Sequence, residues 1–153
     1  AQLNAVYHQL KPKIRILKAE LSGKGILVYM VVPSQGNDKI YYDIDFWFDS
    51  QSRISLSTNF KVYSNSPAFG YSYAYLFNQQ GSLLFPEKYP KIMLTQPPNV
   101  RNPFSTISFD KHVYAALAYI QKENLAAIIQ QSHNKNIDVS KFQDKMEELK
   151  KKK

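Results

Sequence analysis

Residues 40–48 alternate strictly between two kinds of side chain, and this run constrains the fold more than any other part of the chain. One side of the run carries Ile40, Tyr42, Ile44, Phe46 and Phe48, and the other carries Tyr41, Asp43, Asp45, Trp47 and then Asp49. A period of two residues is typical of a β-strand with one buried face. The run therefore predicts a half-buried strand.

Residues 53–63 alternate in the same way, so we predict a hairpin with its turn at residues 50–52. Pairing Phe48 with Ile54 gives one register on which both faces agree. The other pairs in that register are Phe46 with Leu56, Tyr42 with Phe60, Asp49 with Arg53, and Tyr41 with Lys61.

The chain before this hairpin predicts a helix and a second hairpin. Leu3, Val6, Tyr7 and Leu10 have helical spacing, and Pro12 ends the helix near Lys11. Residues 13–21 and 26–32 are separated by Ser-Gly-Lys-Gly, which favours a hairpin turn. An alternative stays open, in which one long helix carries the apolar stripe Leu10, Ile14, Leu17 and Leu21.

Residues 69–77 form a third alternating run, which we interpret as a strand followed by a short apolar segment at residues 83–85. Its aromatic side consists of Phe69, Tyr71, Tyr73, Tyr75 and Phe77. Such a ladder is suited to stacking the bases of single-stranded nucleic acid. There is no Lys or Arg between residues 69 and 80, which favours burial beneath a helix or a neighbouring subunit.

The rest of the chain predicts a loop and two helices. Residues 86–103 are rich in proline and indicate a long loop of the kind that often contacts partners. Ser108 or Asp110 caps the first helix, and Asp138 or Ser140 begins the second. The first helix carries Val113, Leu117, Ile120, Leu125, Ile128 and Ile129 on one face, and the second carries Phe142, Met146 and Leu149.

These elements together predict an α+β fold in one domain spanning residues 1–153. We expect an antiparallel β-meander of about four to five strands. A short N-terminal helix precedes the meander, and the proline-rich loop and the two C-terminal helices follow it.

Net charge and composition limit the classes of function that this chain can have. The formal net charge is +8, and Lys150–Lys153 form a basic C-terminal tail without which it is +4. Such a tail is either a solvated terminus or a contact for phosphates or an acidic protein. The sequence contains no cysteine, which excludes disulfides, thiol catalysis and cysteine-based metal sites. No apolar run reaches the roughly 18 residues of a membrane span, so we expect no membrane partner.

Candidate catalytic residues are sparse. Asp43, Asp45 and Asp49 share a strand face, as carboxylates do in two-metal nucleases, but their expected cross-strand neighbours suit a polar outer face. His8, His112 and His133 are scattered, and the chain has no nucleophile elbow and no phosphate-binding glycine loop. We therefore expect no enzyme activity, no catalytic residue, no cofactor and no metal.

Three short motifs carry a resemblance to a known family. They are Ser64-Asn65-Ser66-Pro67-Ala68-Phe69, the aromatic step Tyr73-Ala74-Tyr75 with the later Asn102-Pro103, and Asp110-Lys111-His112 followed by Ala116-Leu117. Their order resembles the SWIM-like zinc-binding pattern of a group of tailed-phage virion proteins, Cys-x-Cys-x-x-Phe through Cys-Lys-His. Here Ser64, Ser66 and Asp110 stand where that pattern has cysteines. Because serine is not a thiolate, the resemblance implies a variant that has lost its metal.

The resemblance implies a non-enzymatic structural or assembly component of a phage virion, in the head–tail connector, tail or baseplate region. Such a protein is made in the host cytoplasm, resides in the virion and contacts other virion proteins in multiple copies of a symmetric assembly. Our expected partner-contact residues are Tyr71, Tyr73, Tyr75, Pro97, Pro98, Arg101, Lys150, Lys151, Lys152 and Lys153. The alternatives are a small basic nucleic-acid-binding protein that uses the tail and, as a third class, a metal-dependent nuclease.

Overall fold

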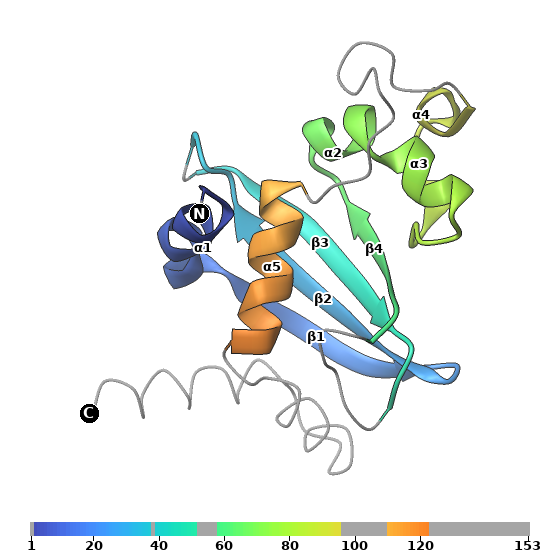
Figure 1. Cartoon of the computed structure of the whole chain (residues 1–153), viewed down its shortest axis with the longest axis horizontal. Coiled ribbons are helices and arrows are strands. Elements are labelled where there is room, and N and C mark those ends of the chain that lie inside the picture. Colours follow the sequence, from blue (N-terminus) through green and yellow to red (C-terminus); the bar gives the residue numbers. More distant parts are fainter. Residues whose placement is uncertain (1, 38, 52–57, 96–109, 123–153) are drawn as a thin grey trace.

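The computed structural model describes residues 2–37, 39–51, 58–95 and 110–122. Its elements follow in the order of a helix, a four-stranded antiparallel sheet, a group of short helices and a longer helix (Figure 1). The predicted α+β class and the predicted meander are confirmed, with strands in the order β1-β2-β3-β4.

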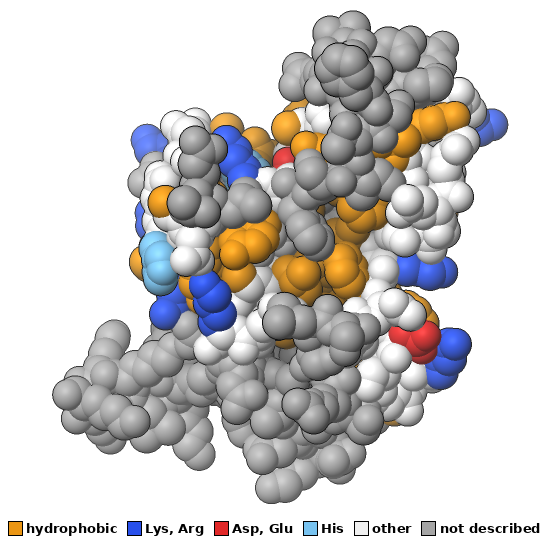
Figure 2. All heavy atoms as spheres, viewed as in Figure 1, with side chains coloured by type: hydrophobic (Ala, Val, Ile, Leu, Met, Phe, Trp, Pro, Cys, Tyr) orange, Lys and Arg blue, Asp and Glu red, His pale blue; other side chains and the backbone are white. Residues whose placement is uncertain are grey.

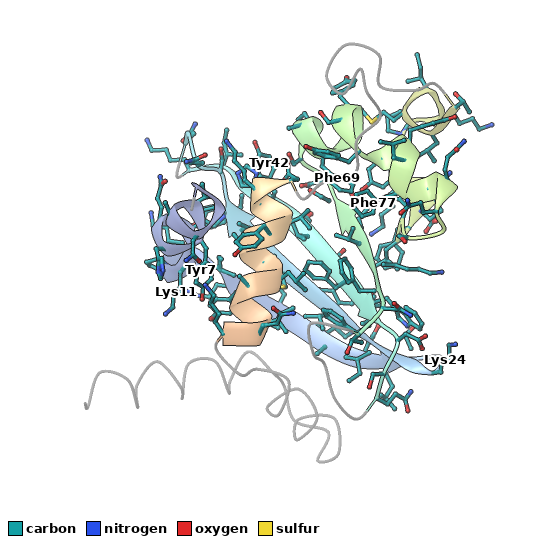
Figure 3. All side chains as sticks on the ribbon, in the orientation of Figure 1. Tyr7, Lys11, Lys24, Tyr42, Phe69 and Phe77 are labelled. Atoms are coloured by element: carbon teal, nitrogen blue, oxygen red, sulfur yellow. The ribbon has the colours of Figure 1, made fainter. Side chains whose placement is uncertain are left out.

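The N-terminal helix α1 spans Gln2–Leu10 and continues into a 3₁₀ turn at Lys11–Lys13. Pro12 has no amide hydrogen to continue the α-helix, so the predicted end near Lys11 is confirmed. Tyr7 lies buried where α1 packs against α5 (Figure 3). Lys122 of α5 secures this contact, because its Nζ donates to Asn4 Oδ1 at 2.7 Å and lies 4.8 Å from the Tyr7 ring centroid.

Strands β1 (Arg15–Ser22) and β2 (Gly25–Pro33) form the first predicted hairpin. Gly23 has φ of +58°, a conformation that glycine adopts without strain, and a Cβ at Gly25 would overlap the Phe48 carbonyl oxygen. The alternative of one helix with a stripe through Leu17 and Leu21 is wrong, since both leucines are exposed on a strand.

Strands β3 (Tyr41–Phe48) and β4 (Phe60–Ser64) are paired as predicted, but the predicted register is wrong. Phe48 lies opposite Phe60 instead of Ile54. The other observed pairs are Trp47 with Lys61, Phe46 with Val62, Asp45 with Tyr63, and Ile44 with Ser64, and the Asp49 amide donates to the Asn59 carbonyl at 2.9 Å. Phe60 therefore does not face Tyr42, and Lys61 does not face Tyr41. Residues 52–57, which include Arg53, Ile54 and Leu56, lie outside the described residues.

The error in register has a simple physical reason. The true pairing is displaced by six residues, an even number, and a strand has a side-chain period of two. An even displacement keeps every apolar side chain on the buried face, so alternation alone does not distinguish Ile54 from Phe60. Ring packing favours the observed register, because the Phe60 ring lies 5.7 Å edge-on to Phe46 and 6.2 Å from Phe48.

The core lies between the sheet and the two helices α1 and α5, which cover one of its faces (Figure 1). Its fully buried residues include Ile16, Ile26, Val28, Met30, Ile44, Phe46, Phe48, Val62 and Ile120. Burial of these side chains supplies the main stabilising term of the fold.

The third alternating run is not a strand. Residues 67–79 form two short helices, α2 (Pro67–Ser72) and α3 (Ala74–Gln79). Pro67 occupies the first turn of α2, where its missing amide is tolerated. In this run every second residue is aromatic, and therefore every fourth residue is aromatic as well. Phe69, Tyr73 and Phe77 are spaced four apart, so they can form a stripe along one face of a helix.

The described part of the proline-rich segment is folded. Leu83 forms a parallel bridge with Val62, a 3₁₀ turn covers Pro86–Lys88, and helix α4 spans Lys91–Thr95. The prediction of one long loop from residue 86 is therefore wrong for residues 86–95, and residues 96–103 lie outside the described residues.

The first predicted C-terminal helix is observed as α5 (Lys111–Lys122), and Asp110 is its N-cap. The predictions for Ser108, for Leu125, Ile128 and Ile129, for the last helix and for the lysine tail fall outside the described residues. Within the part of the chain that is described, no helix has the length and hydrophobicity to cross a bilayer.

Candidate functional site

Helices α2, α3 and α4 form a compact aromatic unit beside β4. The Phe69 ring lies 6.1 Å from Tyr73 and 5.5 Å from Phe77, and Figure 3 shows Phe69 and Phe77 on the side that faces the sheet. A Cβ at Gly70 would lie 2.8 Å from Met93 Sδ, so the glycine allows α4 to pack closely against α2. The unit is thus held by ring packing and by contacts among the three helices.

This unit exposes two large apolar side chains, which we name the α2/α4 surface. Tyr71 on α2 is 53% exposed and Ile92 on α4 is 59% exposed. In the sequence they are the neighbours of Gly70 and Met93, at which the two helices touch. Figure 2 shows hydrophobic side chains at the surface of this part of the molecule. Apolar side chains that are exposed together in one patch are typical of protein interaction sites.

The structure divides the predicted tyrosine contacts. Tyr71 faces solvent, whereas Tyr73 packs partly buried against the core. Tyr75 is half-buried, and its phenol oxygen accepts from Gln79 Nε2 at 2.8 Å. Pro97, Pro98, Arg101 and Lys150–Lys153 lie outside the described residues.

Asp110 and His112 form a buried polar pair at the start of α5. Asp110 Oδ1 accepts from the His112 amide at 2.9 Å and from the Val113 amide at 3.3 Å, the pattern of a helix N-cap. Burial favours the neutral carboxyl, but the hydrogen bond and charge of His112 and the two amides outweigh it, so the pKa of Asp110 is lowered.

The His112 ring connects α5 to the sheet. Its Nε2 accepts from the Gln35 amide at 3.3 Å. Nδ1 lies 3.5 Å from Asp110 Oδ1, and the edge of the ring meets Tyr42 with centroids 5.0 Å apart. The pair therefore orients α5 on the sheet.

The serine half of the phage-like pattern is also buried. Tyr89 Oη donates to the Ser64 carbonyl and accepts from the Ser64 amide, both at 2.9 Å, and Ser64 Oγ accepts from the Ser66 amide at 3.1 Å. Ser64 pairs with Ile44 on β3, two residues from the Tyr42 that meets His112. The described residues contain no group of three or more His, Asp or Glu able to hold a metal ion.

The outer face of the sheet contains an acidic group under aromatic rings, which we name the Asp45 cage and define as Asp45, Tyr29, Tyr63, Phe85 and Lys88. Tyr29 and Tyr63 flank Asp45 in the strand register. Phe85 stacks on Tyr29 at 6.4 Å and meets Tyr63 at 6.0 Å. Lys88 Nζ lies 4.5 Å from the Phe85 centroid and 5.1 Å from the Tyr63 centroid.

Asp45 is only 5% exposed, although alternation places it on the face predicted to be polar and open. Burial raises the pKa of Asp45 to about 6, against the opposing effects of Lys88 and the Met30 amide. Phe85, whose ring meets both flanking tyrosines, has a left-handed backbone conformation with φ of +53°. Sequence reasoning missed Phe85, Lys88 and Tyr89, and the available signal was an aromatic residue directly before each of Pro86 and Pro90.

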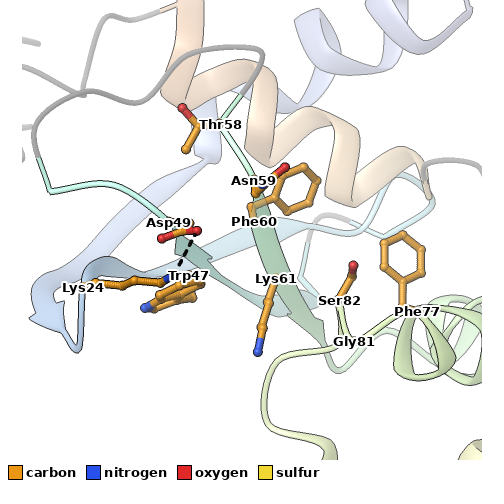
Figure 4. Close-up of a pocket in the computed structure, with 10 residues that line it drawn as sticks. All are labelled: Lys24, Trp47, Asp49, Thr58, Asn59, Phe60, Lys61, Phe77, Gly81 and Ser82. Atoms are coloured by element: carbon orange, nitrogen blue, oxygen red, sulfur yellow. Dashed lines mark ion pairs between the residues drawn. The ribbon is translucent and has the colours of Figure 1, made fainter.

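A pocket of about 580 Å³ opens beside β3 and β4 (Figure 4). Its walls include Trp47 and Lys61, and Lys61 Nζ lies 5.8 Å from the Trp47 ring centroid. Lys24 Nζ is paired with Asp49 Oδ2 at 3.6 Å, and Trp47 Nε1 donates to the Ser22 carbonyl at 2.9 Å. An indole with an adjacent ammonium group forms a stacking surface for a flat ligand.

Asp43, Asp45 and Asp49, which share a strand face in the sequence, have different environments. Asp43 is exposed and accepts from Asn65 Nδ2 at 3.4 Å, Asp45 lies in its cage, and Asp49 is paired with Lys24. His8 is exposed on α1, and His133 lies outside the described residues.

The chain matches no protein-family model, no curated protein and no solved structure.

Proposed function

We propose that this protein is a non-enzymatic assembly component that binds other proteins through the α2/α4 surface. The observation that carries the proposal is the exposure of Tyr71 and Ile92 on two short helices that pack against each other. A buried aromatic cluster fixes these helices, so binding a partner there would order few side chains.

The polar groups of the described residues support a non-catalytic role. Asp110 caps a helix, His112 accepts from a backbone amide, and Tyr89 bonds both backbone groups of Ser64. Each of these groups is engaged in a hydrogen bond to the backbone, and none of the three is shown next to a nucleophile that it could activate.

The assembly we propose is the virion of a tailed phage, in its connector, tail or baseplate region. This part of the proposal follows from the SWIM-like pattern of Ser64, Ser66, Asp110 and His112. In its support, the two halves of the pattern flank the same short stretch of β3, since Ser64 pairs with Ile44 and His112 touches Tyr42.

Particle composition tests the phage assignment. In virions purified from the infected host, mass spectrometry is expected to find the chain in fixed stoichiometry with other virion proteins. Its absence from intact particles would contradict the proposal.

A double substitution tests the surface. Tyr71→Ser with Ile92→Ser is expected to lower incorporation into particles at least tenfold and leave the circular dichroism spectrum unchanged. The matched control is Ile40→Ser, which removes an apolar side chain of 45% exposure outside the α2/α4 surface. Equal incorporation of both variants would count against this surface.

A second candidate function is binding of single-stranded nucleic acid, favoured by the Trp47 and Lys61 pocket. A Lys61→Ala variant would then bind a fluorescent oligonucleotide several-fold more weakly, with a reduced dependence on salt. No binding by the wild-type chain at low salt would remove this candidate.

A further inference from the structure

Residues 85–88 form a short segment, which we name the strap, and both of its ends are tied to β4. Just before the strap, the Leu84 amide donates to the Val62 carbonyl at 2.9 Å. Just after it, the Tyr89 phenol oxygen donates to the Ser64 carbonyl and accepts from the Ser64 amide, both at 2.9 Å. The strap is therefore a stretch of chain between two fixed points on one strand.

Side chains hold the strap on the outer face of the sheet. The Phe85 ring stacks on Tyr29 of β2 at 6.4 Å and meets Tyr63 of β4 at 6.0 Å. Both tyrosines are register partners of Asp45 on β3, so one ring joins the strands on either side of that carboxyl group. Lys88 Nζ lies 4.5 Å from the Phe85 centroid and 5.1 Å from the Tyr63 centroid, which adds a cation–π contact.

The strap carries backbone strain at its first residue. Phe85 has φ of +53° and ψ of +54°, a left-handed conformation that a residue with a side chain adopts only when its surroundings hold it there. The Lys88 amide donates to the Phe85 carbonyl at 3.0 Å, a bond inside the strap. Among the described residues, lifting the strap would therefore relieve strain and break no backbone hydrogen bond between residues 85–88 and the sheet.

Asp45 lies in a place that suits its neutral form. It is 5% exposed, and although both residues are described, no ion pair joins it to Lys88, whose ammonium group lies on the rings instead. A buried carboxylate without a direct counter-ion is unfavourable. Burial accordingly raises the pKa of Asp45 to about 6, with a smaller contribution from Asp43 and against the effects of Lys88 and the Met30 amide.

We propose that the strap is a pH-sensitive cover, which is closed while Asp45 is protonated and lifts when Asp45 is ionised. In the closed form the Phe85 ring bridges Tyr29 and Tyr63, as in the structure. In the lifted form Phe85 leaves the tyrosines, and Lys88 moves from the rings to pair with the carboxylate. Lifting thereby opens to water a carboxylate that is flanked by two tyrosine rings.

The other titratable groups near Asp45 differ from it. Tyr29 and Tyr63 have pKa values raised above 10, mainly by burial, so both stay neutral below pH 8. Burial also raises the pKa of Tyr89 at the end of the strap. Asp43 lies on the same face of β3 but is exposed. Burial therefore distinguishes Asp45 from its neighbouring aspartate.

The charged groups of the surrounding elements have positions of their own. Lys18 and Glu20 of β1 pair with each other at 3.0 Å. Lys61 of β4 lies over the Trp47 ring at 5.8 Å, and Glu87 of the strap is exposed. Lys88 is thus the cation whose charge acts on Asp45.

The two forms of the strap give Asp45 different pKa values, which sets the direction and size of the effect. The pKa is about 6 in the closed form, and a carboxyl group open to water has the ordinary value of 3.8. Between these values the closed form binds more protons, so closure is favoured below pH 3.8 and this preference is lost as the pH rises through 6. A difference of about two in pKa changes the ratio of lifted to closed forms by about a hundredfold.

Nuclear Overhauser effects between aromatic rings test the strap on the full chain without a partner. At pH 4 the Phe85 ring should show these effects to Tyr29 and to Tyr63, and at pH 7.5 their intensity should be at least fivefold lower. Asp45→Asn should keep the pH 4 intensities at pH 7.5, whereas the matched control Asp43→Asn should behave like the wild type.

Two outcomes of this experiment would overturn the proposal. One is that the effects from Phe85 stay unchanged at pH 7.5 in the wild type, which would mean that Asp45 titrates under a closed strap. The other is that they are lost in Asp45→Asn as well. His8 and His112 are present in every variant, so a change that they cause would persist in Asp45→Asn.

Substitutions in the strap provide a second test that does not depend on the folding of Asp45→Asn. Phe85→Gly removes the bridging ring and the backbone strain, so the midpoint of the Asp45 carboxyl titration, followed by carbon-detected NMR, should fall from about 6 to below 5. Lys88→Met keeps the ring and removes the cation, so its midpoint should move in the opposite direction. A midpoint that stays near 6 in Phe85→Gly, with an unchanged circular dichroism spectrum, would contradict the role of the strap.

The strap goes beyond the proposed function, because it concerns the outer face of the sheet and requires no partner. Both tests use the isolated chain, so their failure would leave the α2/α4 surface unaffected. Loss of particle incorporation on substitution of Tyr71 and Ile92 would likewise leave the strap unaffected.

Discussion

Asp45 and Asp110 are both buried carboxyl groups, yet their surroundings move their pKa values in opposite directions. Burial raises the pKa of Asp45 to about 6, whereas His112 and two amides outweigh burial and lower the pKa of Asp110. The difference lies in the donors, because Asp110 accepts two backbone hydrogen bonds beside a histidine and Asp45 lies among aromatic rings with one lysine nearby. Burial by itself therefore does not fix the charge of a carboxyl group.

The largest expected effect is the loss of the Asp110 cap. Asp110→Ala removes the acceptor of two buried amides and the partner of His112, so we expect the free energy of unfolding to fall by about 3–4 kcal/mol. Asp110→Asn keeps an acceptor oxygen and should lose less than half of that. Urea unfolding at pH 7 measures both, and equal losses for the two variants would show that the charge, not the cap, dominates.

The next effect concerns Asp45 and has the opposite sign. The native Asp45 keeps its proton up to about pH 6, whereas an ordinary carboxyl has a pKa of 3.8, so between these values the native state binds more protons. Its contribution to stability is therefore present below pH 3.8 and is lost as the pH rises through 6. Asp45→Asn stays neutral, so at pH 7.5 it should be more stable than the wild type by about 2–3 kcal/mol.

That advantage should shrink to near zero at pH 4, as measured by urea unfolding at both pH values. Asp43→Asn is the control, an exposed aspartate on the same strand face. A pH-independent gain for Asp45→Asn would contradict the assigned titration of Asp45.

At low pH, Asp110 is expected to affect stability in the opposite direction to Asp45. Because its native pKa is lowered, its stabilising effect is present above the ordinary value of 3.8 and is lost as the pH falls through the native pKa. The Asp110→Asn variant should therefore lose less stability than the wild type below pH 4.

The smallest expected effect comes from Lys88. Lys88→Met keeps an apolar side chain over the rings and removes the charge that lowers the pKa of Asp45, so that pKa should rise above 6. The stability should change by about 1 kcal/mol or less. Carbon-detected NMR titration of the Asp45 carboxyl measures the shift. Lys61→Met, whose ammonium group lies over Trp47, should leave it unchanged.

Local pattern predicted the first half of the molecule well. Residues 2–48 follow their predicted order of helix, hairpin and strand, because Pro12, the glycines at 23 and 25 and the alternation of β3 each act within a few residues. Such signals depend on backbone sterics and side-chain period, which are properties of the sequence itself.

Local pattern gave wrong predictions where the sequence fits two types of secondary structure, or two strand registers, equally well. Phe69, Tyr73 and Phe77 suit a strand and a helix alike, and only their packing with Tyr89 and the sheet favours the helix. For β4, Ile54 and Phe60 have the same parity, and the rings of Phe46 and Phe48 favour Phe60.

The candidate sites also fall into those that local sequence indicated and those that it did not. The sequence indicated Asp110, with Ser108 as the alternative, as a helix cap, since a cap needs only its own first turn. It did not indicate the Asp45 cage, because Phe85 and Lys88 are more than 35 residues away along the chain and reach Asp45 only after β4 has paired.

The sequence by itself determined the class of fold, the first three strands, the end of α1 near Lys11 and a helix after Asp110. The tertiary structure alone decided the register of β4, the helical state of residues 67–79 and the protonation of Asp45. The physical reason is the sequence separation over which each kind of interaction acts. Backbone sterics and side-chain period act between near neighbours, whereas ring packing, burial and the pKa of a buried acid depend on groups that only folding brings together.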